Sequence, residues 1–119
     1  MIILIKTLHI FAAFTVVASL SAVVIHVRNG GSKANNSSRA LMGAAHGLGL
    51  LVSLLSGFAM LGMMKLGAPA WALSKLVIWF VLGGSTVLLY RKPSTATALW
   101  LGSILLASLA AFLAIAKPF

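Results

Sequence analysis

A small set of ionisable and aromatic side chains offers most of the chemistry in this sequence. Lys6 and His9 are three residues apart, so a helix would place them on one face. Lys75 is flanked at a spacing of four by Trp71 and Trp79. A neutral imidazole is the commonest metal ligand in proteins, haem iron included. Placing an ionisable side chain inside a membrane-spanning helix costs free energy. Such residues, where they occur, therefore indicate a functional site.

The composition excludes many kinds of catalytic site. The chain has 119 residues, no Asp or Glu and no Cys. Without carboxylates there is no paired-carboxylate hydrolysis, no triad that needs Asp, and no carboxylate site for magnesium or calcium. Without Cys there is no disulfide, no thiolate nucleophile and no iron–sulfur ligation. Histidine, lysine, arginine, hydroxyl, aromatic and methionine side chains remain.

The net charge of +9 does not indicate nucleic acid. The basic residues stand singly or in pairs at the ends of apolar runs, with no basic stripe interleaved with aromatics. They are typical of helix anchors that face anionic lipid headgroups. The alternative is that some bind an anionic ligand. Haem carries two propionates, and only Lys or Arg could pair with them in this chain.

The elements that must position these residues are membrane-spanning helices. Hydrophobic residues make up 61% of the chain and charged residues 8%. We expect an all-α transmembrane domain over residues 1–119, with helices at about 2–28, 39–65, 70–91 and 95–116. Each is long enough to cross about 30 Å of hydrocarbon. Short connections between them predict an up-down-up-down four-helix bundle.

The distribution of Lys and Arg predicts the orientation. The first and third connections and their borders carry Arg28, Lys33, Arg39, Arg91 and Lys92. The second connection and the carboxyl end carry Lys65 and Lys117. By the positive-inside rule, the first and third connections face the cytoplasm. Both termini then lie outside, on the periplasmic side if the membrane is a bacterial inner membrane.

The three histidines fall in opposite halves of the membrane. His9 lies at the outer end, at a depth similar to that of Lys6 and Lys75. The alternative for both lysines is that they snorkel to the headgroups. His26 and His46 lie on the inner side, where they could form a second pair of metal ligands. Alternatively, His26 sits at the interface and His46 hydrogen-bonds between helices.

Two further readings of the sequence need no haem. Gly43 and Gly47 are four residues apart, a spacing that lets helices approach closely in lipid. The protein could therefore be a structural or accessory subunit, in a homo-oligomer or a larger membrane complex. Met60, Met63 and Met64 share the outer end with His9, and thioether sulfur suits copper(I). This would make the protein a copper-handling one, although methionine is also a common gap-filler.

Three short motifs resemble the HemJ-type protoporphyrinogen oxidase family. The opening Ile5-Lys6-Thr7-Leu8-His9-Ile10 is similar to that family's apolar Lys-x-Leu-His-Ile start. Trp71-Ala72-Leu73-Ser74-Lys75-Leu76 resembles its Trp-x-x-x-Lys-Leu motif, and Lys117-Pro118-Phe119 its ending. The CopD and SirB families of small membrane proteins share parts of this pattern. The end of the first helix departs from it, because it keeps His26 and Arg28 without the family's Pro-Arg.

The resemblance implies a haem b site and a redox function. His9 would be an axial ligand, and Lys75 a second ligand or a propionate partner assisted by Lys6. Trp71 and Trp79 would wall the site, which would open toward the outer half of the membrane. The family's activity is oxidation of protoporphyrinogen to protoporphyrin, so the resemblance makes an enzymatic role one expectation for this chain.

Overall fold

A computed structural model describes residues 1–119 as an all-helical chain. Its elements are α1 (Ile2–Arg28), α2 (Arg39–Met63), α3 (Ala70–Arg91), the short 3-10 helix η1 (Pro93–Thr95) and α4 (Ala96–Ala116). All four α-helices are long and apolar enough to cross a membrane. The expected all-α four-helix bundle is therefore confirmed.

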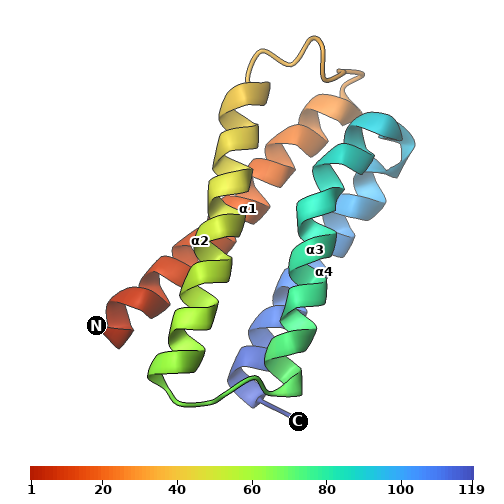
Figure 1. The fold of residues 1–119 in the computed structure, drawn as a ribbon. Helices are drawn as coiled ribbons and strands as arrows, with labels where there is room; N and C mark the ends of the chain where they lie inside the picture. Colours follow the sequence, from red (N-terminus) through yellow and green to blue (C-terminus); the bar gives the residue numbers. More distant parts are fainter.

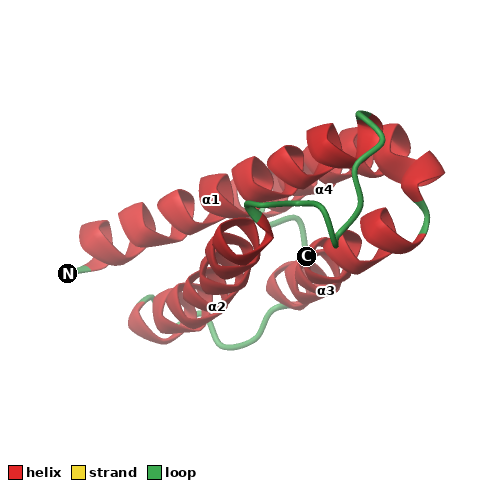
Figure 2. Ribbon diagram, turned by 90° about the horizontal axis from the view of Figure 1, so that it is seen from above, coloured by secondary structure: helices red, strands yellow, loops and turns green.

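The helices run up and down, and the bundle has two distinct ends (Figure 1). The α1–α2 and α3–α4 connections meet at one end, which we call the loop end. Both termini and the α2–α3 connection lie at the other end, which we call the terminal end. Seen from above, α1 and α4 form one layer and α2 and α3 the other (Figure 2). The bundle measures 47 × 25 × 15 Å between Cα atoms.

The outer surface of the bundle is apolar along its length. Large apolar side chains point outward from the helices, among them Phe14, Phe80 and Ile115, which are 70%, 68% and 83% exposed. A soluble monomer rarely exposes continuous apolar surface on this scale. Lipid tails are the natural environment for such a surface, so the fold suits a bilayer.

Two helix ends differ from the boundaries expected from the sequence. The second helix was expected to reach residue 65, but α2 ends at Met63. Lys65 adopts a left-handed backbone with φ of 54°, which cannot continue a right-handed helix. The last helix was expected to begin at residue 95. Pro93 instead begins a 3-10 turn, and α4 starts at Ala96.

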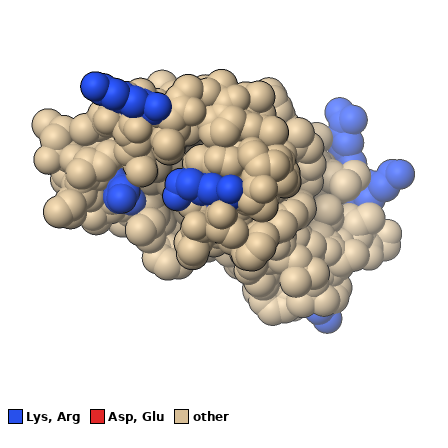
Figure 3. Space-filling view, turned by 90° about the horizontal axis from the view of Figure 1, so that it is seen from below, with Lys and Arg blue, Asp and Glu red and all other residues tan.

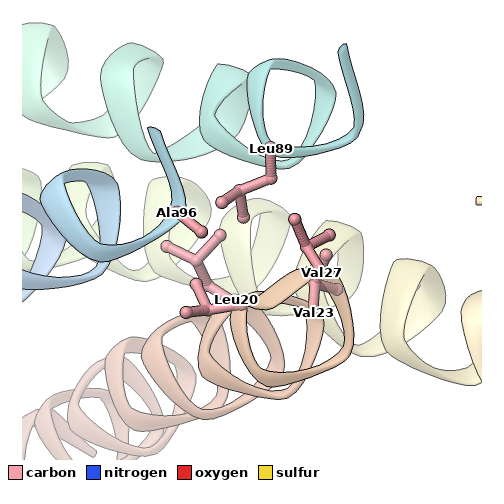
Figure 4. Packing of buried hydrophobic residues seen from close by; sticks show 6 residues of the cluster. Leu20, Val23, Val27, Leu89 and Ala96 are labelled. Carbon is pink, nitrogen blue, oxygen red and sulfur yellow. The ribbon is translucent and has the colours of Figure 1, made fainter. Parts of the chain in front are cut away.

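A tightly packed cluster closes the loop end. It consists of Leu20, Val23, Val24, Val27, Leu89 and Ala96 (Figure 4). Leu89 of α3 is fully buried, and it points into the cluster toward the side chains of α1 and Ala96 of α4 (Figure 4). Interdigitated side chains of this kind hold helices together in lipid, where packing replaces the hydrophobic effect. The helices are therefore packed tightly against one another at the loop end.

The terminal end is more open. Helix α1 packs against α2 at Gly49, where an added Cβ would fall 2.9 Å from a methyl group of Val16. From this contact α1 continues at a tilt, so that its N-terminal end moves away from α4 (Figure 1). The helices therefore leave space between them at the terminal end, and this space contains the candidate site.

Candidate functional site

A groove lies between the four helices at the terminal end. Its volume is about 450 Å³, within the range of about 300–1,000 Å³ that is usual for small-molecule sites. Its walls are mostly apolar, and every α-helix contributes to them. The polar groups that line it include His9 and three lysines, Lys6, Lys75 and Lys117. The groove thus combines an apolar body with a few convergent polar groups.

His9 is held by a hydrogen bond from α1 to α2. Its Nδ1 lies 2.8 Å from the hydroxyl oxygen of Ser56. That hydroxyl has one proton, which it donates to the carbonyl oxygen of Val52 at 2.6 Å. The Ser56 oxygen is therefore free to accept, and His9 donates from Nδ1. In this neutral tautomer the other ring nitrogen, Nε2, carries a lone pair.

The Nε2 atom of His9 is available to a ligand. It makes no hydrogen bond within the chain. Among the side-chain nitrogen and oxygen atoms that protein fully encloses, only Thr86 Oγ1 has no hydrogen-bond partner. Because His9 Nε2 also has no partner but is not in that group, protein does not fully enclose it. Gly57 leaves room for the ring, because an added Cβ there would lie 3.4 Å from His9 Cε1. A donor at one nitrogen and a free lone pair at the other is the usual arrangement of a metal-binding imidazole.

The lysines surround this imidazole with positive charge. Lys6 is exposed and Lys75 is half-buried, and both line the groove. Lys117 donates from Nζ to the carbonyl oxygen of Ala114 at 2.8 Å. No Asp or Glu exists in the chain to neutralise them. Seen from below, the basic side chains lie singly over the surface with no acidic side chain beside them (Figure 3).

Both tryptophans form walls of the groove. Trp71 is buried near the start of α3. Trp79 lies two turns further along and donates from Nε1 to the carbonyl oxygen of Leu50 at 2.8 Å. This bond fixes the indole ring between α3 and α2. The structure therefore brings together all five residues expected at the outer site: Lys6, His9, Trp71, Lys75 and Trp79.

The other two histidines do not meet. His46 is buried, with Nε2 at 3.2 Å from the carbonyl oxygen of Leu82 and Nδ1 at 3.4 Å from that of Val16. A neutral imidazole has one N–H, so His46 donates to one carbonyl at a time, and the shorter contact is the one to Leu82 of α3. His26 instead lies against the α1–α2 connection, where Nε2 is 2.8 Å from the carbonyl oxygen of Ser32. The structure gives this pair no shared metal position.

Two of the three methionines considered for copper share the groove with His9. Met60 and Met64 line the groove, whereas Met63 does not. No group of three His, Cys, Asp or Glu side chains gathers anywhere in the chain. A bare metal ion that depends on several such ligands therefore has no site here. A metal carried in a macrocycle would need only axial ligands from the protein, because the macrocycle brings its own equatorial ligands.

Ser56, Gly57 and Lys117 are parts of the site that sequence reasoning missed or assigned elsewhere. Ser56 and Gly57 face His9 only because α1 and α2 cross at one particular angle, and no spacing along the chain encodes that. Lys117 was counted only as a charge at a helix end and as part of a motif. The sequence could have indicated its role, because Lys117 follows the last helix and therefore lies at the same end of the bundle as Lys75.

No protein-family model, curated protein or solved structure matches this chain.

Proposed function

We propose that this protein is a small integral membrane protein that binds haem b in the groove at the terminal end. His9 would be the axial ligand through Nε2. The observation that carries the proposal is the hydrogen bond from His9 Nδ1 to Ser56, because it leaves Nε2 with a free lone pair on the groove wall. The HemJ-like opening motif around His9 points to the same residue.

The groove suits a porphyrin in four respects. Its volume of about 450 Å³ and its apolar walls suit a large, flat, apolar body. It offers one free imidazole nitrogen, which is enough for a metal that arrives inside a macrocycle. Its only charged groups are lysines, which are the partners that propionates need. Trp71 and Trp79 add flat aromatic walls.

Each residue has a distinct role in this site. Ser56 holds the imidazole in the tautomer that exposes Nε2. Lys75 is the propionate partner, or a second axial ligand, and Lys6 adds positive charge at the mouth. The two tryptophans exclude water from the apolar part of the groove. When bound, the haem supplies one-electron redox chemistry, so the protein would act as a redox protein of HemJ/CopD-like type.

We further propose that the site faces the periplasm of a bacterial inner membrane. The loop end carries more Lys and Arg than the connections at the terminal end, which by the positive-inside rule puts the loop end in the cytoplasm. Because the chain has no Cys, a single introduced cysteine reports on sidedness. Ser32→Cys should react with an impermeant thiol reagent only after the cells are opened, and Gly67→Cys should react in intact cells.

A second candidate is a cofactor-free accessory subunit, favoured by one face of α2. Gly43 and Gly47 point into open space, with no atom within 4 Å of an added Cβ. Small residues on an open face allow another membrane helix to approach closely. Under this reading Gly43→Leu and Gly47→Leu would disrupt an assembly, whereas His9→Ala would have no effect.

Haem titration separates the two candidates. Purified protein in detergent micelles is titrated with ferric haem b, and the visible spectrum is recorded. We expect saturable binding at one haem per chain, lost in His9→Ala and retained in His26→Ala, because His26 lies at the loop end. Equal binding by the wild type and His9→Ala would overturn the assignment of the ligand, and no binding by the wild type would overturn the haem proposal.

A further inference from the structure

Lys75 and Lys117 line the same groove, and no Asp or Glu side chain pairs with either of them. Lys75 is on α3 and Lys117 directly follows α4, and both side chains line the groove at the terminal end. Repulsion between like charges grows as the surroundings become less polar, and most of the groove wall is apolar. The sequence has no Asp or Glu side chain to pair with either lysine, so an anionic ligand in the groove would find two free partners.

Lys117 is held in place at the groove rather than extending freely into the surroundings. Its backbone is left-handed, with φ of 46°, which turns the chain at the end of α4. Its ammonium group donates to the carbonyl oxygen of Ala114 and lies 5.5 Å from the centre of the Trp71 ring, within range of a cation–π interaction. An ammonium group has three protons, so donors remain for a further partner.

Both lysines are also held in position relative to the apolar wall of the groove. Trp71 is buried, so the ring beneath Lys117 is not free to move with it. Lys75 follows Trp71 by one turn of α3, and both line the groove. A ligand that places its apolar body against the groove wall would therefore present its edge to two ammonium groups.

We propose that Lys75 and Lys117, with Trp71 as the platform under Lys117, form a carboxylate-binding site that holds the propionates of the porphyrin in the groove. This inference rests on the proposed haem function and adds to it a rule of selectivity. The protein should discriminate against a porphyrin whose carboxylates are esterified, even though the metal and the ring are unchanged.

The test compares ferric haem b with its dimethyl ester by titration of the purified protein in neutral detergent. Charge-assisted hydrogen bonds lost on esterification should weaken binding by about tenfold to a hundredfold. Lys117→Gln should weaken binding of the free acid by a similar factor and leave binding of the ester unchanged. Lys75→Gln should do the same, because in this inference Lys75 contacts a propionate and not the metal. Glutamine keeps a donor for Ala114, so Lys117→Gln preserves the cap on α4.

Two sets of variants serve as controls. Lys65→Gln removes one charge at the same end of the bundle but outside the groove. It should change neither the affinity for the free acid nor the affinity for the ester. Lys75→Arg and Lys117→Arg keep the charge and should retain the preference for the free acid. These controls separate local recognition from a general effect of net charge or of misfolding.

The remaining outcomes overturn the inference in distinguishable ways. Equal affinity of the wild type for acid and ester would remove the carboxylate site while leaving the haem function intact. Loss of bound anionic phospholipid in the two glutamine variants, with haem affinity unchanged, would assign the lysines to a lipid headgroup instead. Failure of both acid and ester to bind the wild type would overturn the proposed function itself.

Discussion

Removal of the Ser56 hydroxyl tests whether the imidazole is positioned by a second helix. In Ser56→Ala, His9 loses the acceptor that lies 2.8 Å from its Nδ1, so neither the ring orientation nor the tautomer is fixed. Loss of such a supporting hydrogen bond typically costs about 10-fold to 100-fold in metal affinity, or roughly 1.4–2.8 kcal/mol. The fold should lose less than about 1 kcal/mol, because the average side-chain hydrogen bond within a membrane contributes about 0.6 kcal/mol.

The assay is a haem titration of the purified protein, paired with thermal unfolding of the haem-free form. Ser53→Ala is the matched control, because Ser53 also lines the groove but its hydroxyl donates only to the carbonyl oxygen of Leu50, three residues back. We expect weaker binding in Ser56→Ala and unchanged binding in Ser53→Ala, at similar unfolding temperatures. Wild-type affinity in Ser56→Ala would refute the positioning role, and so would equal losses in both variants.

Other predictions concern the packing that supports the site, and thermal or detergent unfolding measures each of them. Gly49→Ala should destabilise the fold by about 1–3 kcal/mol because its methyl group would overpack α1, whereas Gly47→Ala should be neutral or slightly stabilising. His46→Ala should cost about 1–3 kcal/mol, because it removes a buried side chain together with its hydrogen bond to a backbone carbonyl. Leu89→Ala should leave a cavity and cost about 2 kcal/mol, while Leu105→Ala, which faces outward, should cost little. Equal effects within either matched pair would contradict the packing described here.

The fold could be predicted from the sequence because length and hydropathy decide it. An apolar run of about 20 residues bounded by Lys, Arg, Gly or Pro has few alternatives to a membrane-spanning helix. The exact ends of the helices were harder to predict, because nothing about a lysine at position 65 indicates a left-handed backbone. A lysine in that conformation is uncommon, and glycine is the residue that usually marks it.

The candidate site could be predicted only in part. Depth along each helix follows from position in the sequence, so Lys6, His9 and Lys75 were expected at one level of the bundle, and all three line the groove. The rotation and crossing of helices depend on tertiary packing, so the pairing of His9 with Ser56 was not foreseen. Depth alone also allowed His26 and His46 to meet, whereas the crossing of α1 over α2 gives each histidine separate partners.

The central claim is that this chain binds haem through His9, and the most direct test is the visible spectrum of the protein purified from cells with ample haem. The account predicts a strong Soret band that shifts and sharpens on reduction with dithionite, and that is missing from His9→Ala expressed and purified in the same way. A wild-type spectrum without any haem band, or a His9→Ala spectrum identical to the wild type, would contradict it.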